Sequence, residues 1–458
     1  MGLKIDSATS SRSMKTREEL SAGHGSAILA RPWLTVFLPI NAALSGFSVI
    51  LPVLILFAYG GTVVAVALAI TLYNIMVIPG AFFWGRVCDV MSRRRPLLVL
   101  NYAAVGVIFL LSGLIHSLDA LLVLYAIFGW FAPSGAAASN LMIMERFDLH
   151  ERPTAFTSFT EMGVIGGTLG ILAGLFWVTQ YPGNLPSFLY LVSLLAFVSL
   201  SMLFVLVPER KGRLERSAIA HHHESLDSRL RTLYPFFLGL PTRRFWDRTY
   251  HWLRKEATHD VPLILAASFL FNFAANLFNT SYTPFLEVLG LGAAGVFMVN
   301  LANNAAQAFS LPFSARTSEG ELAERSVVTA SWMRASGYAG VFAFAALLPL
   351  GLLKSSGHDP LFLPFNVVFY GLLGVAVAFY TTSSSLLLFR SLERRSAGSY
   401  LGMNSALGGL AAILGSGLSG VITSDVGFSA TFGISVVAMV LAVPVWLLSA
   451  RAYRTRHL

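Results

Sequence analysis

Twelve long apolar runs constrain this chain more than any other feature of its sequence. A bilayer core about 30 Å thick needs about 20 apolar residues per helix, and continuous runs of that length favour helices over the alternating strands of a barrel. The chain is 55% hydrophobic and 12% charged, against about 25% charged in a soluble domain. We therefore predict an all-α integral membrane protein. The predicted spans are 33–57, 62–84, 96–116, 119–144, 154–179, 187–207, 261–286, 291–314, 326–352, 361–389, 396–422 and 427–450.

Lysine and arginine residues gather on alternate connections between these runs. Five lie in 1–32, four in 85–95, two in 145–153, eleven in 208–260, two in 315–325, three in 390–395 and three in 451–458. On the opposite side we find only Lys354, and Arg334 falls inside a predicted span. This asymmetry predicts a multi-pass protein of the cytoplasmic membrane with both termini in the cytoplasm. It also explains most of the net charge of +9 without any nucleic-acid partner.

The chain repeats itself. The stretch "ERPTAFTSFTEMGVIGGTLGIL" from 151 and "ERRSAGSYLGMNSALGGLAAIL" from 393 share seven identities at a constant offset, and Pro52 and Gly60 recur as Pro284 and Gly292. Six spans per half preserve orientation, so the repeat is parallel. We predict a tail (1–32), a six-helix half (33–207), a cytoplasmic linker (208–260), a second six-helix half (261–450) and a basic tail (451–458). Within the linker, 241–256 is typical of an amphipathic helix lying on the inner leaflet.

The connection "GRVCDVMSRRRP" between spans 2 and 3 is unusually rich in charge. Arginines alone would anchor a cytoplasmic hairpin, and a solvated basic turn is one interpretation. Together with the two six-span halves, however, this loop resembles the major facilitator superfamily, whose pattern is Gly, three residues, Asp, Arg, any residue, Gly, Arg, Arg/Lys. The matching residues are Gly85, Asp89, Arg93 and Arg94, whereas Val90 and Ser92 depart from the pattern.

The resemblance covers spans 1 to 12 and implies a secondary transporter that works by alternating access. It further implies that Asp89 lies at the cytoplasmic N-terminus of span 11, where the helix dipole favours a carboxylate. Gly85 would permit close helix contact there. The four matching residues would then form a conformational latch that holds the outward-open state.

Polar side chains are costly in hydrocarbon and should therefore face the interior. In span 7, Asn272, Asn276 and Asn279 are spaced by four and three residues, which places them on one helical face. The resemblance implies that spans 1, 4, 7 and 10 line the central site, which adds Asn41, Tyr125 and Tyr370 as substrate-pathway candidates. Tyr125 stands where the family often carries an arginine tied to proton coupling. The alternative for the asparagines is structural bonding between helices, which we favour for Asn300, Asn303, Asn304 and Gln307 in span 8.

Glu161 is the one carboxylate deep inside a predicted span. An acid in hydrocarbon costs about 2.5–3.5 kcal/mol on insertion scales, so Glu161 is a candidate proton carrier or cation site. The alternative is a glutamate that faces the cytoplasmic vestibule about two turns from the start of its span. For Arg334 we expect snorkelling to the cytoplasmic surface.

Missing motifs exclude several other functions. No glycine is followed by lysine, so no phosphate-binding loop is present, and HExxH and GxSxG are absent as well. We predict no enzyme activity, no catalytic residues, no cofactor and no metal site; the histidines at 221–223 are read as part of a solvated linker. The predicted function is secondary active transport of a small neutral or amphipathic organic solute by a monomer in the bilayer, with protons as the candidate coupling ion. The alternative is a transporter-like receptor that binds a ligand without moving it.

Overall fold

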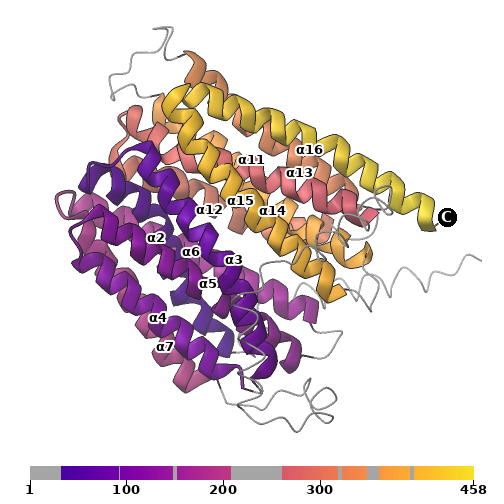
Figure 1. Ribbon diagram of the computed structural model, residues 1–458, viewed down its shortest axis with the longest axis horizontal. Helices are drawn as coiled ribbons and strands as arrows, with labels where there is room; N and C mark the ends of the chain where they lie inside the picture. The colour runs from indigo at the N-terminus through magenta and orange to yellow at the C-terminus, as the bar shows by residue number, and fades with distance from the viewer. Residues whose placement is uncertain are drawn as a thin grey trace, which may run out of the picture.

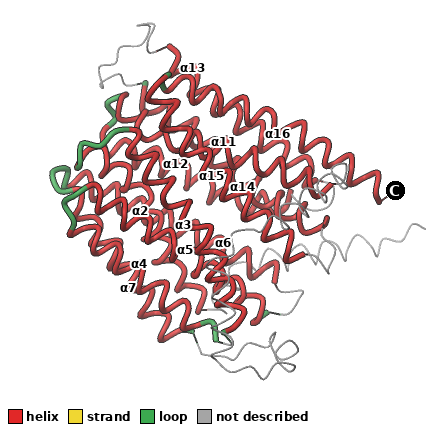
Figure 2. The backbone as a smooth tube through the Cα atoms, in the orientation of Figure 1, coloured by secondary structure: helices red, strands yellow, loops and turns green. Residues whose placement is uncertain are grey.

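The computed structural model describes residues 32–91, 93–147, 152–207, 260–317, 322–347, 361–391 and 397–457. Within these ranges the regular structure is helical and contains no strand (Figure 2). The helical elements are η1 (Pro32–Val36), α2 (Phe37–Val53), η2 (Leu54–Ala58), α3 (Val63–Val90), α4 (Arg95–Leu114), α5 (Leu118–Arg146), α6 (Arg152–Gln180), η3 (Leu185–Ser187), α7 (Phe188–Leu206), α11 (Asp260–Val288), α12 (Gly292–Thr317), α13 (Leu322–Leu347), α14 (Phe362–Ser391), α15 (Ala397–Asp425) and α16 (Phe428–His457). The predicted linker helix, the 221–223 histidines, Lys354 and the tail before Pro32 lie outside the described residues.

The twelve long helices of the described ranges form two halves of six, which Figure 1 shows in indigo to magenta and in orange to yellow. The N half comprises α2 to α7, and the C half comprises α11 to α16. Helix contacts repeat between them: α2 packs on α6 as α11 packs on α15, α3 on α5 as α12 on α14, and α4 on α7 as α13 on α16. The predicted fold of two parallel six-helix repeats is confirmed.

The backbone carries the same repeat at the first turn of each half. Pro52 lies inside α2 and Pro284 inside α11. After each helix the chain turns through a glycine in the left-handed region, Gly60 with φ 61° and Gly292 with φ 62°. A side chain rarely adopts this conformation, which explains why glycine recurs at both positions. The sequence repeat therefore reflects one turn geometry used twice.

Ten of the twelve long helices are apolar and long enough to cross a membrane by length and composition. The two that fall short are α12 and α13, although both were predicted as spans. Polar side chains lower the mean hydropathy of both helices. In α12 these are Asn300, Asn303, Asn304 and Gln307, and in α13 they are Glu324, Arg325 and Arg334. Helix α16 continues to His457, past the predicted span end at 450, so the predicted tail 451–458 begins as helix.

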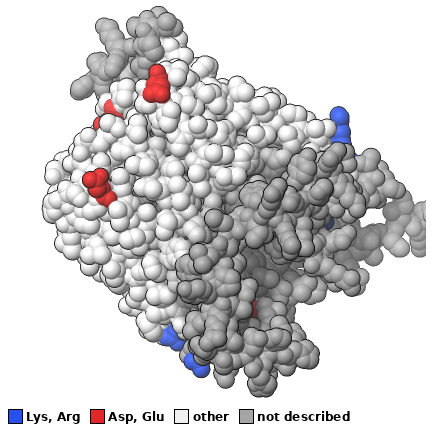
Figure 3. All heavy atoms as spheres, viewed as in Figure 1, with Lys and Arg blue, Asp and Glu red and all other residues white. Residues whose placement is uncertain are grey.

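The helix ends define two sides of the molecule. We call one side the basic side, because all described arginines except Arg334 lie there. The other side, where short turns join α2 to α3 and α11 to α12, is the turn side, and it carries Asp119, Glu287 and Asp425. In Figure 3 the visible blue atoms lie at the lower and right margins, and most of the visible red atoms lie on the left. Apart from Arg334, arginines are thus confined to one side among the described residues, as the sequence predicts for a membrane protein with a fixed orientation, whereas acids occur on both sides, because Glu145 and Glu324 also lie at the basic side.

The two halves meet where α3 packs on α15 and where α6 packs on α12. The hydroxyls of Thr71 and Ser416 are 2.9 Å apart across the first contact, and the rings of Phe188 and Phe297 meet edge to face near the second, with centroids 5.8 Å apart. All four residues lie between mid-depth and the turn side. Further from the turn side, Ile78 of α3 still lies 3.0 Å from the position of a Cβ on Gly409 in α15, whereas a Cβ on Gly85 would meet nothing within 4 Å. The contact between the halves therefore runs from the turn side to about mid-depth.

Candidate functional site

Helix α11 separates its aromatic and amide side chains onto different faces. Phe278 and Tyr282 stack on Tyr338 of α13 and Tyr370 of α14, with ring centroids 4.1 and 4.4 Å apart. These rings hold α11 inside the C half. The helix also contacts α2 and α3 of the N half. Asn272, Asn276 and Asn279 lie on a face of α11 without these rings, the first two half-buried and the third exposed. Asn276 borders α15 of its own half, because its Cβ is 3.0 Å from the position of a Cβ on Gly415.

The asparagine side chains of α12 differ in the helix that they face. Asn303 donates from Nδ2 to the backbone oxygen of Tyr370 at 2.8 Å, which ties α12 to α14 as the packing interpretation expects. Asn300 and Asn304 lie on a neighbouring face, and the Oδ1 atom of Asn304 is 3.5 Å from the position of a Cβ on Gly167 in α6. This face of α12 is thus turned toward the N half, so the span 8 asparagines do not all serve packing within the C half.

Asn74 on α3 was missed by the sequence reasoning. Its neighbours Tyr73 and Gly80 face α5, while Thr71 and Ile78 face α15, so the half-buried Asn74 lies between these two contact faces. The sequence repeat could have identified Asn74. Asn304 of the second half lies 230 positions later, close to the offset of 232 between Pro52 and Pro284.

Six asparagines on α2, α3, α11 and α12 share one hydrogen-bonding pattern, and we call them the amide set. Each donates from Nδ2 to the backbone oxygen four residues earlier in its own helix. The bonds are Asn41 to Phe37 (2.7 Å), Asn74 to Ile70 (2.9 Å), Asn272 to Ser268 (2.8 Å), Asn276 to Asn272 (2.9 Å), Asn300 to Val296 (2.9 Å) and Asn304 to Asn300 (3.3 Å). Counted at about 1.5 Å per residue, five of the six lie roughly 18 to 26 Å from the basic end of their helices, and Asn41 lies roughly 13 Å from Pro32, where η1 begins.

Two glycines of α6 bring members of the amide set from both halves together. A Cβ on Gly163 would lie 3.6 Å from Oδ1 of Asn41 in α2. A Cβ on Gly167 would lie 2.6 Å from the hydroxyl of Ser45 and 3.5 Å from Oδ1 of Asn304 in α12. A side chain at Gly167 would therefore displace these polar atoms. The glycines leave room for amide oxygens from the N half and the C half within one turn of α6.

The two tyrosine candidates are placed in aromatic packing rather than among the amide set. Tyr125 is only 9% exposed, stacks on Tyr73 at 4.8 Å and lies near Phe47 at 5.9 Å. Tyr370 stacks on Tyr282, and its backbone oxygen accepts the Asn303 bond described above. The two tyrosines occupy equivalent positions of α5 and α14, so each half uses its tyrosine in the same kind of packing.

Glu161 lies on α6, partly buried, near the basic side. The apolar window of this helix runs from Ser158 to Gln180, so Glu161 is only about one turn inside the apolar segment. Counted from Arg152 at about 1.5 Å per residue, Glu161 lies roughly 13 Å from the basic end of α6. This depth is close to that of Asn41, because Gly163, two residues further along α6, lies beside the Asn41 amide.

The four latch candidates lie at the basic end of α3 and the start of α4. Gly85 makes no close approach, and Arg93 is exposed. The backbone of Asp89 belongs to the last turn of α3, but its side chain is outside the described residues. Arg94 is 6% exposed and donates from Nη1 to the backbone oxygens of Cys88 and Met91, the latter at 2.6 Å.

Arg94 also pairs with Glu145 at the end of α5. Nε and Nη2 donate to the same carboxylate oxygen at 3.0 and 2.8 Å, and both side chains are buried. The C half has an acid where the N half has this arginine: Glu324 near the start of α13, which accepts a bond from Arg454 at 2.7 Å. Each half is thus held together at its basic end by a buried charge with a partner on another helix.

Arg334 does not reach the surface, so the expectation of snorkelling is wrong. Its side chain is 6% exposed, donates from Nε to the hydroxyl of Tyr338 at 2.7 Å and lies with Cζ 4.7 Å above the ring of Phe271. A cation over an aromatic face is stabilised by the ring quadrupole. The aromatic side chains of the C half therefore stabilise the Arg334 charge inside the helix bundle.

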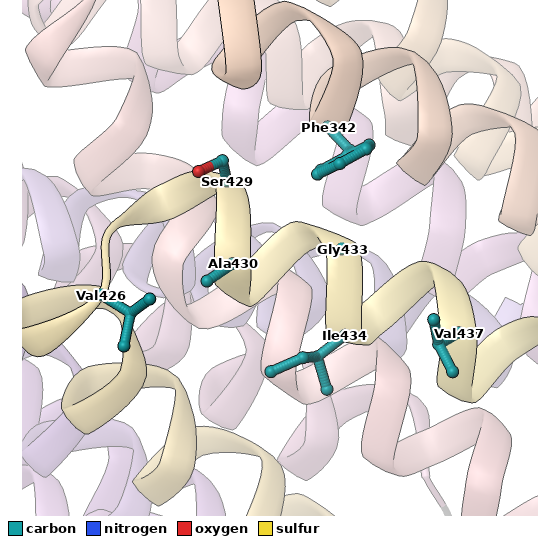
Figure 4. A pocket seen from close by; sticks show the side chains of 7 residues that line it. All are labelled: Phe342, Val426, Ser429, Ala430, Gly433, Ile434 and Val437. Atoms are coloured by element: carbon teal, nitrogen blue, oxygen red, sulfur yellow. The ribbon is translucent and has the colours of Figure 1, made fainter. Parts of the chain in front are cut away.

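A surface groove of about 440 Å³ lies between α13 and α16, away from the amide set. Figure 4 shows its lining, which is apolar apart from the hydroxyl of one serine. The lining residues are Phe342, Val426, Ser429, Ala430, Gly433, Ile434 and Val437. Such a lining suits lipid chains rather than a polar solute. Across the described ranges, no group of three or more His, Cys, Asp or Glu side chains could hold a metal ion.

Two pseudo-symmetric six-helix halves with a polar set between them define a membrane transporter of the secondary class. A sequence profile of the Major Facilitator Superfamily matches residues 33–372, and the chain belongs to this family. It is a multi-pass membrane protein of a non-enzymatic family that moves small molecules.

Two similar solved structures support the fold. A mutant of the nucleoside transporter NupG is 13% identical with a TM-score of 0.65, covering 91% of this chain and 98% of that one. The structure titled nucleoside transporter NupG is 14% identical with a TM-score of 0.61, covering 92% and 98%. No curated protein sequence matches. At these identities the likeness concerns the fold alone.

Proposed function

We propose that this transporter moves a small uncharged or amphipathic organic solute by alternating access, with the amide set as its binding site. The observation that carries the proposal is the position of Asn41 and Asn304, whose oxygens come from different halves to the same turn of α6. A solute held between the two halves is exposed to one side or the other when they rock about it. In this structure the halves are in contact on the turn side, and a cycle of this kind also requires a state in which they separate there.

The alternative is a receptor with the same fold that binds a ligand without moving it. Counterflow separates the two functions, because only a transporter exchanges labelled solute outside for unlabelled solute inside. Uridine is the first probe, since the similar structures are of a nucleoside transporter, and glucose and inositol follow. We expect counterflow of at least one probe in proteoliposomes, lost when Asn272→Leu and Asn276→Leu are combined.

Asn140→Leu is the control for this experiment, because it removes an exposed amide of α5 outside the amide set. It should keep wild-type exchange. A solute that binds the purified protein and stabilises it against heat, yet shows no counterflow, would support the receptor instead.

We further propose that the basic side faces the cytoplasm, which is supported by the arginines gathered at that side. Single cysteines test this orientation in a Cys88→Ser background. Asp119→Cys, at an exposed position on the turn side, should react with an impermeant maleimide in intact cells. Arg93→Cys, exposed on the basic side, should react only after permeabilisation, and the reverse pattern would refute the orientation.

For coupling we propose protons, with Glu161 as the carrier. A carboxyl group at the edge of the apolar window would be hydrated in one state and buried in the other, and burial favours its neutral form. Glu161→Gln should then abolish accumulation driven by a proton gradient while counterflow, which needs no net proton movement, continues. Glu287→Gln, which removes an acid at the turn-side end of α11, should leave both activities intact. Normal accumulation by the Glu161 variant would rule this carrier out.

A further inference from the structure

We infer that the amide set selects solutes that present several hydrogen-bond donors, as hydroxyl or N–H groups, and rejects anions. This inference rests on the proposed function, since it assigns a substrate class to the same site. It follows from the direction in which the six amides are held and from their distribution over both halves.

The orientation of each amide follows from its partner. A backbone carbonyl oxygen can only accept a hydrogen bond, so the atom next to it must be the donor Nδ2 and cannot be Oδ1. All six members bond a carbonyl of their own helix, so the Oδ1 atom occupies the other arm of the amide. Each residue then offers two acceptor lone pairs and one remaining amide hydrogen. Acceptors exceed donors in this site by two to one.

Other asparagines of the chain show what a purely structural amide looks like. Asn366 makes the same bond to its own helix at 2.8 Å, but its Oδ1 accepts the hydroxyl of Tyr282 at 2.9 Å. Asn101 donates across helices to the backbone of Phe131 and the hydroxyl of Ser134. In contrast, no donor among the described residues reaches an Oδ1 atom of the amide set. These oxygens belong to partly exposed side chains and are not bonded by any described residue, so a donor from the solvent or from a solute can bond them.

Two charged residues of the described ranges lie near these helices. Arg334 is held by Tyr338, which accepts its bond, and by Phe271, whose ring covers its guanidinium. Glu161 lies two residues before Gly163, the glycine beside Asn41. An anion placed among acceptor oxygens would lack donors to replace its hydration, and burying an unpaired charge is costly. An ammonium group carries three donors and no acceptor, so the site disfavours anions and accepts neutral or cationic donors.

Oxygens from both halves lie beside one turn of α6. Gly163 and Gly167 are about 6 Å apart along the helix at 1.5 Å per residue, and they lie beside the oxygens of Asn41 and Asn304 respectively. A compact solute with donors on two of its sides would bond both halves at once. Hydroxylated rings such as sugars, cyclitols and the ribose of nucleosides carry donors at several positions around a compact frame.

The test measures binding of matched solutes to the purified full-length protein by calorimetry and thermal shift. The neutral probes are uridine, glucose and myo-inositol, each paired with its fully O-methylated analogue, which keeps the shape and loses the hydroxyl donors. The charged probes are uridine monophosphate, gluconate and glucosamine. We expect at least one neutral probe or glucosamine to bind. A methylated analogue should bind about tenfold more weakly than its parent, because it has lost the hydroxyl donors that the amide oxygens accept. The anions should bind no better than their neutral parents.

Asn276→Leu should weaken the best neutral probe by a similar factor, while Asn140→Leu should not. The inference is wrong if the methylated analogue binds as well as its parent, if a phosphate or carboxylate is the strongest ligand, or if none of the neutral probes and glucosamine binds. Counterflow is recorded on the same samples and keeps the two proposals apart. If a donor-bearing probe binds strongly but shows no counterflow, transport is refuted and the substrate class stands. If an anion shows counterflow, the substrate class is refuted and transport stands.

Discussion

Replacing Arg94 with alanine should destabilise the protein by about 3–5 kcal/mol, because truncating one partner of a buried ion pair leaves the other charge uncompensated. Glu145 would keep its buried carboxylate without the two bonds at 3.0 and 2.8 Å. The backbone oxygens of Cys88 and Met91 would lose their donor as well. The measurement is thermal unfolding of the purified protein in detergent, where Arg94→Ala should unfold at a clearly lower temperature than the wild type.

Arg95→Ala provides the matched control, because it removes the same charge from the next residue. Arg95 bonds the backbone oxygen of Phe204 at 2.9 Å in an exposed position, and an exposed contact of this kind is worth about 1 kcal/mol or less. Combining Arg94→Leu with Glu145→Leu removes both charges and should recover much of the loss. Equal stability of Arg94→Ala and Arg95→Ala would show that the buried pair does not hold the N half together.

The helices themselves could be predicted from the sequence because each has to bury about 20 apolar residues in the bilayer, and that length is visible in every run. The repeat was visible for a related reason. Gly60 and Gly292 adopt the same left-handed turn, and a backbone constraint of this kind admits few residue types. The amides of α12 lower its hydropathy, but the length of its apolar run and the turns on either side still predict a span.

Neighbours across helices could not be predicted in the same way. Helical spacing places Asn300, Asn303 and Asn304 on roughly one side of α12, but it does not tell which of them meets α14 and which meets the N half. Only Asn303 turned out to bond α14. For Tyr125 and Tyr370 the periodicity likewise gave no indication of the ring stacking that buries them within their own halves.

Charged residues show the same limit most clearly. The arginines of the first basic loop indicated a membrane orientation, yet the partner of Arg94 lies 51 positions away in α5. Arg334 was expected at the surface because a long side chain can reach it. Its stabilisation by Tyr338 and Phe271 depends on packing between α11 and α13, which no local pattern reveals.

Alternating access requires the halves to separate on the turn side, and a reversible cross-link between Thr71 and Ser416 tests this most directly. Their hydroxyls are 2.9 Å apart across the contact of α3 with α15, so Thr71→Cys combined with Ser416→Cys should form a disulfide under oxidation. Counterflow in proteoliposomes is then measured before oxidation, after oxidation and after reduction. The matched control combines Ser314→Cys with Thr382→Cys, whose hydroxyls are 3.0 Å apart within the C half.

We expect oxidation to reduce counterflow at least tenfold in the Thr71 and Ser416 double variant, because the solute can no longer reach the turn side, and reduction to restore it. The control double variant should exchange solute equally well in both redox states, since the halves move as rigid groups in this mechanism. If the protein cross-linked between Thr71 and Ser416 exchanges solute as fast as its reduced form, the halves need not separate there, and transport by alternating access between them is contradicted.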